Sequence, residues 1–591
     1  MKRLFVLAPL AMILILGLAA LTGCDGGSSS SQTTPPSITS FTANPTSIAS
    51  GSSAALTGVF ANGTGIITPG NLAATSGVAV TVSPTATTTY TLTVTPTSGP
   101  AVTATATVTM ASVVVSTVTV DLTSSGPAVT DKLLGVNMAV WYDLVGNQSG
   151  ILNAFQSAGI TQVRWPGGSD SDLYHWATNT ECDNGYADSN DTFSNFVSDM
   201  ALPAKVDVAL TANYGSNSSC NGGGEPSEAA AWVAAAVAAG VTPSHMTVGN
   251  EQYGSWEEDL YTTPIDTPDP TQYASFVVGT DGFYNAIKTA SPNTLVGIDV
   301  DADNTAGGWD NIVMSNAKGS YDFVEYHYYP EAPGSENDTF IVQKAAQELT
   351  TNINTLKSEL AEWGTPNTPI YVGEIGGTYT MPGKQSWSIT QGLYAGQVLG
   401  EMMNDGVSRL TWWIGFGGCS TSGNLSPALY GWQNFGGYNI FSDGPDDGAD
   451  CPGAGATGTM SPTARAFQLF SQMDVNGQTV LTATVAGDTT DVRAYAATNP
   501  NNATALWLFN DNENLAQPVS ITLSGKSSSS SVTVTTYDKV IYDLSGSPTG
   551  TPPDPVGTST WAPPITTSMG AQTLPLTLTL SPWSMNMVII Q

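Results

Sequence analysis

The chain contains 591 residues, with 15 Lys and Arg against 48 Asp and Glu, so its net charge is −33. A chain of this length exceeds what one hydrophobic core supports, and several domains are therefore expected. The acidic surface repels phosphate backbones and anionic lipid, which argues against nucleic acid as a partner.

Residues 1–24 have the pattern of an export signal: a short basic head, an apolar run, and the letters LTGC ending at Cys24. LTGC resembles the lipobox of bacterial lipoproteins, so we expect cleavage before Cys24 and a lipid on that residue. The protein would then be exported and anchored to the membrane by this lipid alone, at the cell surface or in the periplasm. The alternative, a transmembrane anchor, is disfavoured by the short apolar run. Residues 25–36, rich in Ser, Thr and Pro, are expected to form a linker.

With Cys24 assigned to the lipid, an even number of cysteines remains for an oxidising compartment: Cys182, Cys220, Cys419 and Cys451. Three pairings are possible. The pairs Cys182–Cys220 and Cys419–Cys451 are favoured because each closes a modest local loop.

Residues 37–115 are expected to form a small domain without charge. No Asp, Glu, Lys, Arg or His occurs from residue 26 to residue 120, and short β-rich runs alternate with Gly and Pro. This pattern predicts an immunoglobulin-like β-sandwich. Without ionisable side chains it has no acid–base or metal chemistry, so we interpret it as a spacer; glycan binding is the alternative.

Residues 116–464 alternate between apolar strand candidates and helical segments. Residues 226–240 begin with Pro226 and end on Gly240, as expected of a capped helix, and residues 340–363 have apolar side chains at helical spacing. Eight strands, each followed by a helix, predict an α/β fold of the (β/α)8 TIM barrel type. The expected strands are residues 133–141, 160–168, 205–215, 245–251, 294–303, 321–330, 368–377 and 409–418.

Residues 465–591 return to strand-like patterns and predict a C-terminal β-sandwich packed against the barrel. Residues 113–122, which precede the barrel, are a further candidate strand of this sandwich.

Two carboxylates occur at the ends of barrel strands. Glu251 ends the fourth expected strand and Glu374 ends the seventh, and reactive groups of such barrels lie at the carboxyl ends of the strands. Two carboxyl groups about 5–5.5 Å apart would let one protonate a glycosidic oxygen while the other attacks the anomeric carbon. A Glu at the end of a strand is often only solvated, but the pair predicts a retaining glycosidase.

The motifs around these residues resemble those of clan A retaining glycoside hydrolases. VGNE (residues 248–251) and YVGEIGG (371–377) look like the acid/base and nucleophile signatures of that clan. VRWPGGSDSDLYHW (163–176), TANYGS (211–216) and EYHYYP (325–330) resemble segments of glycoside hydrolase family 51, which consists mainly of α-L-arabinofuranosidases. The resemblance covers roughly residues 116–591.

This resemblance implies roles for individual residues. Glu251 would be the acid/base and Glu374 the nucleophile. Asn250 would hydrogen-bond the sugar 2-hydroxyl, and Arg164 would keep Glu374 ionised. The negative charge of Glu374 would in turn favour protonated Glu251.

Other implied contacts lie on the sixth strand and among the aromatic residues. His327 and Tyr329 match the family's HxY motif, and Tyr329 would orient Glu374. Trp256 and Trp413, near the expected site, are candidates for stacking on sugar. For Arg164 a structural ion pair is an alternative, and for His327 a place in the core.

Two departures weaken the substrate assignment. Ser169 and Asp170 stand where the family has Asn after PGG, and residues 133–141 contain no carboxylate where the family has a Glu–His pair. Both positions hold the terminal arabinofuranose in the family. The reaction is therefore predicted more firmly than the substrate.

We expect no cofactor and no metal, because no His, Cys and Asp cluster has ligand spacing and DVDAD (299–303) is a poor calcium cage. Glu257, Glu258 and Glu325 are expected to be solvated or structural. The predicted activity is removal of α-L-arabinofuranosyl side chains from plant hemicellulose. The alternatives are an endo-β-glycanase of the same clan, cutting xylan or glucan, and a non-catalytic glycan-binding surface lipoprotein.

Overall fold

The computed structural model describes residues 34–48, 53–110, 114–182, 185–444, 454–473, 476–545 and 561–591. The expected signal peptide, most of the expected linker, Cys24 and Cys451 therefore lie outside the described residues. Within the described ranges, no helix combines the length and the apolar character needed to cross a membrane.

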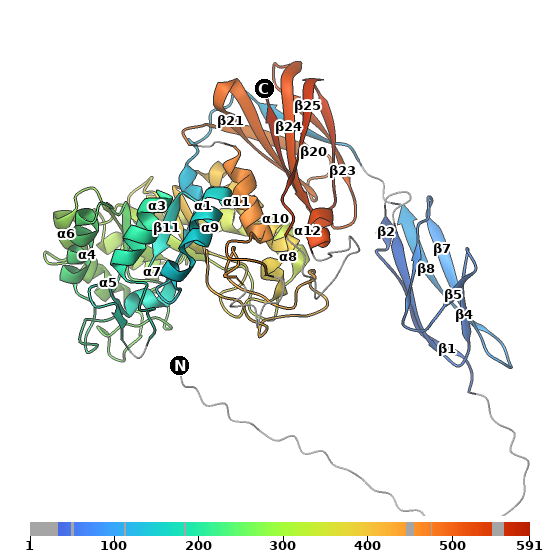
Figure 1. The fold of residues 1–591 in the computed structure, drawn as a ribbon, viewed down its shortest axis with the longest axis horizontal. Coiled ribbons are helices and arrows are strands. Elements are labelled where there is room, and N and C mark those ends of the chain that lie inside the picture. The colour runs from blue at the N-terminus through green and yellow to red at the C-terminus, as the bar shows by residue number, and fades with distance from the viewer. Residues whose placement is uncertain are drawn as a thin grey trace, which may run out of the picture. The chain divides into compact units, whose positions relative to one another are not determined.

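The N-terminal unit is a two-sheet β-sandwich, drawn in blue in Figure 1. One sheet has the order β1-β3-β6 and the other β2-β8-β7-β4-β5. Leu56, Leu92 and Val108 lie fully buried between them, so the predicted sandwich is confirmed. The strands are β1 Ser37–Asn44, β2 Ser47–Ile48, β3 Ala54–Ala61, β4 Thr64–Thr68, β5 Leu72–Ala74, β6 Ala79–Val82, β7 Thr88–Thr95 and β8 Val102–Met110.

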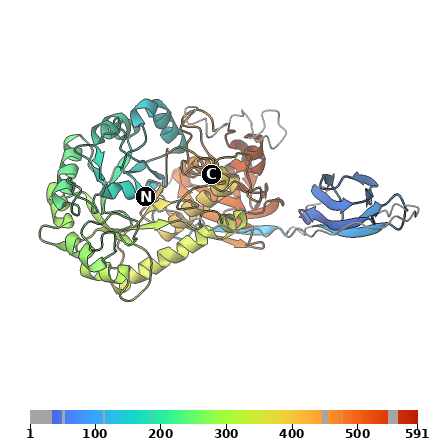
Figure 2. The same ribbon diagram turned by 90° about the horizontal axis from the view of Figure 1, so that it is seen from below.

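Eight parallel strands close the barrel that the sequence predicts, as Figure 2 shows from below. Each strand lies inside its predicted range, because strands buried on both faces are continuous apolar runs. The barrel order follows the chain: β10 Gly135–Asn137, β11 Gln162–Trp165, β14 Asp207–Ala212, β15 His245–Val248, β16 Leu295–Val300, β17 Phe323–Tyr328, β18 Ile370–Ile375 and β19 Arg409–Trp412.

Helices follow every barrel strand: α1 Leu144–Ala158, α2 Phe193–Asn195 with α3 Leu202–Ala204, α4 Pro226–Ala238, α5 Pro270–Val278, α6 Phe283–Ala290, α7 Trp309–Asn316, α8 Asp338–Gln343, α9 Ala345–Glu362, α10 Ile389–Asp405 and α11 Pro462–Ser471. The segment with helical spacing, residues 340–363, is helical but divided into two helices, because the backbone leaves helical geometry at Lys344 (φ −133°). Arg493, far along the chain, donates to the carbonyl of Gln343 at 2.7 Å. It thereby satisfies an acceptor that a continuous helix would use internally.

The C-terminal part is one nine-stranded sheet with the order β25-β24-β27-β22-β21-β20-β9-β23-β26, whose strands share a common apolar core. Strand β9 precedes the barrel in sequence, as predicted for residues 113–122. The transition near residue 465 falls inside α11, which packs on α10 and α1 and so belongs to the barrel's helical layer. The strands are β9 Ser116–Asp121, β20 Val480–Ala486, β21 Val492–Asn499, β22 Ala503–Asn510, β23 Gln517–Leu523, β24 Ser528–Asp538, β25 Ile565–Thr573, β26 Leu576–Leu580 and β27 Ser584–Ile590; α12 Lys539–Ser545 follows β24.

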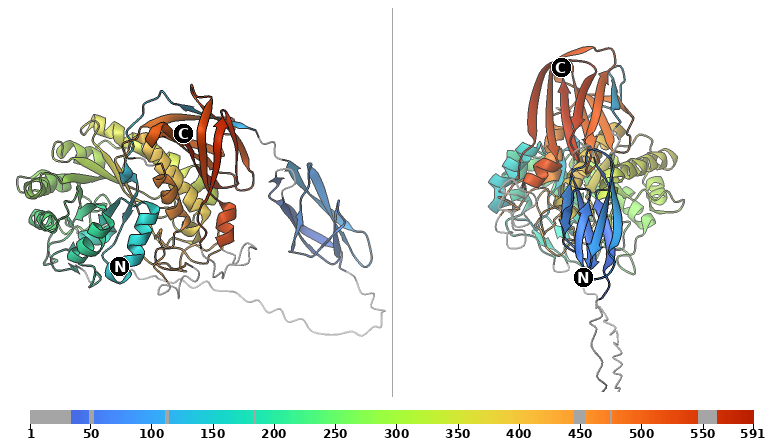
Figure 3. Two further views of the ribbon diagram at one scale, coloured as in Figure 1. Left: turned by 45° about the horizontal axis from the view of Figure 1, so that its top comes forward. Right: turned by 90° about the vertical axis from the view of Figure 1, so that its right-hand side faces the viewer.

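Helix α10 joins the barrel to this sheet, as the left view of Figure 3 shows. A Cβ added at Gly396 would meet the Phe509 ring at 2.8 Å, and one at Gly400 would meet the Tyr495 ring at 2.5 Å. The two glycines are four residues apart and lie on one helix face. They therefore let the helix approach the sheet, which fixes the barrel against it.

The disulfide Cys182–Cys220 is present, with an S–S distance of 2.07 Å and 5.5 Å between the Cα atoms. This pair is confirmed. Cys419 is also disulfide-bonded, and Cys451 lies outside the described residues, so the second predicted pair stays a prediction.

Candidate active site

The two candidate carboxylates lie at the carboxyl ends of their strands. Glu374 is the fifth residue of β18, and Glu251 follows β15 by three residues. Glu251 has φ +46°, a left-handed conformation that a residue with a side chain adopts only when its surroundings impose it. The preceding backbone N–H, that of Asn250, donates to buried Asp172 at 2.8 Å. Asp172 also accepts the N–H groups of Tyr214 and Gly215 and so joins the ends of β14 and β15.

Glu251 and Glu374 face one another beside His327. An oxygen of each carboxylate and a ring nitrogen of His327 lie within 4.8 Å of one another. His327 Nδ1 is 2.8 Å from Glu251 Oε1 and 3.8 Å from Glu374 Oε2. The histidine predicted to contact substrate therefore lies against both carboxylates.

Glu374 is held by two further side chains. Arg164 Nη1 donates to Oε1 at 2.9 Å, and the Tyr329 hydroxyl donates to Oε2 at 2.7 Å. Both oxygens of the candidate nucleophile are therefore fixed in orientation. The structure brings Arg164 and Tyr329 to the positions where the resemblance places them.

Arg164 organises the centre of the site. Its guanidinium also donates to Asn250 Oδ1 at 2.8 Å and to Asn137 Oδ1 at 3.0 Å. Nε forms an ion pair with Glu325 Oε1 at 2.7 Å, although its N–H is not aligned for a hydrogen bond. Only 1% of this arginine is exposed, and such burial is tolerated because carboxylates on two sides compensate the charge.

Asn250 is oriented by Glu257, which was expected from the sequence to be solvated or structural. Its amide donates to Glu257 Oε1 at 3.0 Å, and the Ser169 hydroxyl donates to the same oxygen at 2.8 Å. Glu257 is buried, and its Oε2 has no hydrogen-bond partner among the described residues. Burial, and then the charges of Asp172 and Glu251, raise its pKa well above the usual value. Ser169, one of the two departures, thus belongs to the group that orients Asn250.

Glu325 is likewise buried, so of its two expected places, solvated or structural, the structural one applies. His327 Nε2 lies 3.1 Å from Glu325 Oε1, and the Thr247 hydroxyl donates to the other oxygen. A Cβ at Gly373 would lie closer to Glu325 Oε1 than van der Waals contact allows. Glycine directly before Glu374 therefore makes room for a third carboxylate beneath the candidate pair.

The pKa directions of the pair are the reverse of those expected from their roles. Burial raises the pKa of Glu374, and the charges of His327 and Arg164 offset this only in part. Burial would also raise the pKa of Glu251, but the hydrogen bond and charge of His327 outweigh it and the pKa is lowered. The difference arises because His327 bonds Glu251 directly and lies farther from Glu374.

The cations of the site are stabilised by its carboxylates. Burial would lower the pKa of His327, but Glu374, Glu251 and Glu325 together raise it to about 10. Burial would raise the pKa of Glu325, but Arg164 and His327 lower it. The surrounding carboxylates therefore favour the charged form of His327, and the two cations favour the ionised form of Glu325.

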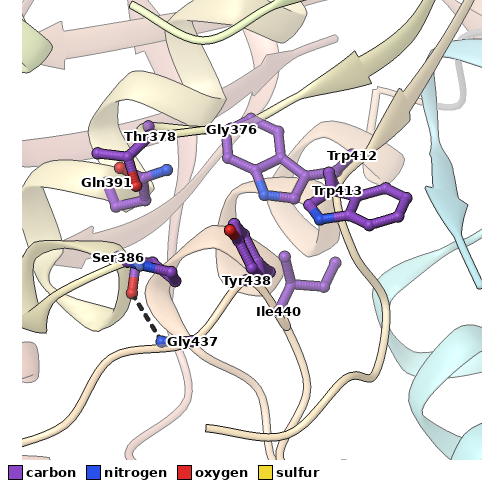
Figure 4. A pocket seen from close by; sticks show the side chains of 11 residues that line it. Gly376, Thr378, Ser386, Gln391, Trp412, Trp413, Gly437, Tyr438 and Ile440 are labelled. Carbon is purple, nitrogen blue, oxygen red and sulfur yellow. Dashed lines mark hydrogen bonds between the residues drawn. The ribbon is translucent and has the colours of Figure 1, made fainter. Parts of the chain in front are cut away.

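Two tryptophans border the site. Trp256 is 64% exposed and its indole N–H donates to Glu251 Oε2 at 2.7 Å. Trp413 lies against Gly168, where an added Cβ would meet its ring at 2.7 Å. Figure 4 shows Trp413 with Tyr438 and Gln391 around a pocket whose lining includes Gly376, two residues after Glu374.

Outside this cleft, two groups among the residues that the structure describes have the distances of metal ligands. His175 lies near Cys182 and Cys220, but both sulfurs form the disulfide. Asp303, Asp310 and Glu359 bring three oxygens within 4.8 Å, yet their carboxylates already accept backbone N–H groups of the loop after β16. Neither group is assigned a metal.

The comparisons with known proteins concern the fold. No protein-family model matches the chain, and no curated protein sequence matches it. The GH51 arabinofuranosidase of Xanthomonas axonopodis pv. citri superposes with a TM-score of 0.58 at 16% identity, covering 81% of this chain and 100% of that one. The α-L-arabinofuranosidase of Thermotoga maritima gives 0.58 at 14%, over 80% and 99%.

A Paenibacillus polymyxa xyloglucanase from glycoside hydrolase family 44 gives a TM-score of 0.53 at 13% identity, covering 81% of this chain and 99% of that one. At these identities the likeness shows the fold alone. The chain therefore has the fold that two families of clan A glycoside hydrolases share, a (β/α)8 barrel with an attached β-domain.

Proposed function

We propose that the protein is a retaining glycoside hydrolase acting on plant polysaccharide, with Glu251 as acid/base and Glu374 as nucleophile. The observation that carries this proposal is that one oxygen of Glu251 and one oxygen of Glu374 lie within 4.8 Å of one another at the carboxyl end of the barrel, so the two carboxyl groups are close together. Retaining enzymes have carboxyl groups about 5–5.5 Å apart, whereas inverting enzymes leave room for water at about 6.5–9.5 Å.

In the first step, Glu374 attacks the anomeric carbon while Glu251 protonates the leaving oxygen. Arg164 and Tyr329 hold the attacking carboxylate, which reduces the reorganisation needed to reach the transition state. Asn250, held by Arg164 and Glu257, is positioned to bond the sugar 2-hydroxyl. In the second step, Glu251 takes a proton from water, and the water releases the sugar from Glu374.

The proposed substrate is an α-L-arabinofuranosyl side chain of hemicellulose. The motif resemblance and the fold likeness to two arabinofuranosidases support it. The first expected strand, residues 133–141, contains no carboxylate where the resemblance expects a sugar-binding one. This departure, the exposed Trp256 and Tyr379, and the likeness to a xyloglucanase favour an endo-β-glycanase as the second candidate.

The decisive experiment is hydrolysis of a panel of aryl glycosides and plant polysaccharides by the protein from residue 25 onward, beside Glu374→Ala and Glu251→Ala. Release of arabinose or another sugar, lost in Glu374→Ala, establishes the enzyme and its sugar. Wild-type inactivity with retained polysaccharide binding would instead support the non-catalytic glycan-binding protein.

Product length separates exo from endo action. Single arabinose units released from arabinoxylan, with the backbone length unchanged, support the arabinofuranosidase. Oligosaccharides from xylan, xyloglucan or glucan support the endo-glycanase.

We also propose that the protein is exported and tethered by a lipid on Cys24, which rests on the N-terminal sequence pattern. Metabolic labelling with a fatty acid, lost in Cys24→Ala together with membrane association, would support this tether. An unlabelled wild-type protein would contradict it.

A further inference from the structure

His327 has a carboxylate on each ring nitrogen. Nδ1 lies 2.8 Å from Glu251 Oε1, and Nε2 lies 3.1 Å from Glu325 Oε1. An ionised carboxylate only accepts hydrogen bonds, so each of these contacts needs a proton. A neutral imidazole carries one N–H and so supplies a proton for only one of the two contacts. The proton of the other contact is either on the carboxyl group or on the ring, and in the second case the ring is a cation.

The contact at Nε2 is fixed by the surroundings of Glu325. This carboxylate is 1% exposed, pairs with Arg164 Nε at 2.7 Å and accepts the Thr247 hydroxyl. A permanent cation and a hydroxyl donor on the same group favour its ionised form. Nε2 therefore carries a proton that it donates to Glu325, and the remaining proton lies between Nδ1 and Glu251.

We propose that the proton Glu251 delivers to the glycosidic oxygen is stored on Nδ1 of His327, and that Glu325 is the positioning residue that maintains this store. The inference rests on the proposed function and adds a source for the catalytic proton. It also explains how Glu251 can act as an acid although its hydrogen bonds and its lowered pKa favour the ionised form.

The proton balance closes within the site. As the glycosidic bond breaks, the Nδ1 proton passes to Glu251 and from Glu251 to the leaving oxygen, which leaves Glu251 ionised and His327 neutral with Nε2–H on Glu325. In the second step, Glu251 takes a proton from the attacking water and returns it to Nδ1. No external acid is consumed over the cycle.

The charges around His327 favour this store. Glu374 and Glu251 face it from β18 and from the loop after β15, Glu325 and Tyr329 from its own segment, Asp299 from β16 and Arg164 from β11. Burial would lower the pKa of His327, but the three glutamates raise it to about 10. Burial raises the pKa of Asp299 well above its usual value. Since histidine and Glu251 share one proton, they titrate as a pair rather than separately.

The first test observes the proton without substrate. The chain has three histidines, so nitrogen-labelled histidine gives a simple NMR spectrum. We expect one imidazolium signal that persists above about pH 8, is absent in His327→Gln, and titrates at lower pH in Glu325→Gln. A neutral His327 ring at about pH 7 in the wild type overturns the proposal.

The second test separates proton delivery from folding by comparing leaving groups. Glu325→Gln keeps the shape of the side chain and removes its charge. We expect kcat/KM for oligosaccharides and alkyl glycosides to fall by ~10²-fold, while dinitrophenyl glycosides, which need no acid, change little. The basic limb of the pH profile should move to lower pH. Glu362→Gln, an exposed carboxylate-to-amide change on α9, is the matched control.

The outcomes are distinguishable. An equal loss for all leaving groups with an unchanged basic limb means that Glu325 is only structural, and the proton store fails while the hydrolase stands. A wild-type protein that hydrolyses no glycoside overturns the proposed function and the proton store together.

Discussion

The two ends of the barrel contain the same kinds of side chain, but the pKa values of their histidines are shifted in opposite directions. At the carboxyl end, His327 lies among Glu251, Glu325 and Glu374, and its pKa is raised to about 10. At the amino end, Arg409 donates to His245 Nδ1 at 2.9 Å and pairs with Asp207. There, burial and then the charge of Arg409 lower the pKa of His245 to about 3.

The difference shows how strand direction assigns roles within one barrel. Both histidines are buried, and burial alone favours the neutral ring. Of these two histidines, only the one where several strand ends bring carboxylates together has a raised pKa. The amino end has one carboxylate beside its arginine, which suits a stabilising ion pair, whereas the carboxyl end has charges in excess, which suits chemistry.

Among substitutions at the two ends of the barrel, we expect the largest loss of activity when the candidate nucleophile is removed. Glu374→Ala should lower kcat by ~10⁴-fold or more, because no other group attacks the anomeric carbon. The matched change at the other end, Asp207→Asn, should leave kcat unchanged. Initial rates on the best substrate measure both, and equal losses would contradict the division between the two ends.

Removal of the candidate acid should have a smaller and more selective effect. Glu251→Ala is expected to lower kcat/KM by ~10²–10⁴-fold for poor leaving groups and much less for dinitrophenyl glycosides. Azide should then restore turnover and give a glycosyl azide of retained configuration, detected by NMR. A product of inverted configuration would exclude the double displacement.

Substitutions at the amino end of the barrel should lower stability and leave turnover unchanged. Arg409→Met removes the ion pair with Asp207 and the bond to His245, and should lower the free energy of unfolding by about 2 kcal/mol. Denaturant unfolding followed by tryptophan fluorescence measures this change, with kcat and KM expected to be unchanged. A loss of kcat without a loss of stability would place this end in the catalytic machinery.

The smallest effect at neutral pH is expected for His245→Gln. The pKa of His245 is lower in the folded chain, about 3 against the usual 6.5, so the unfolded chain binds the proton first. This histidine therefore contributes stability above the unfolded pKa that is lost as pH falls. The difference in unfolding free energy between wild type and His245→Gln should shrink from about pH 7 to about pH 5. A constant difference would show that His245 takes up its proton alike in the folded and the unfolded chain, so that folding does not lower its pKa.

Local pattern predicted the parts of the fold that depend on neighbouring residues. All eight barrel strands and the helix from Pro226 lie where apolar runs, proline and glycine indicate them. The break between α8 and α9 was not predictable, because it depends on Arg493, 150 residues beyond Gln343. The predicted boundary at residue 465 falls inside α11. This helix belongs to the barrel because it packs against α10 and α1, which are distant in sequence.

The candidate site was likewise predicted from the sequence only in part. The eight side chains named from the sequence lie at or border one cleft: Arg164, Asn250, Glu251, Trp256, His327, Tyr329, Glu374 and Trp413. Asp172, Glu257 and Glu325 were missed as members, since an isolated Asp or Glu in a sequence is usually exposed. The available signal for Glu325 was its position two residues before His327, on the same face of a strand, and for Glu257 its closeness to Asn250.

By itself, the sequence determined the strands, most helices, one disulfide and the two carboxylates at strand ends, because these follow from periodicity and from spacing along the chain. Only the tertiary structure decided which carboxylates share His327 and Arg164. A carboxylate's charge depends on burial and on ions within a few ångströms, and these neighbours come from strands up to 210 residues apart. The protonation of the site is therefore a property of the closed barrel.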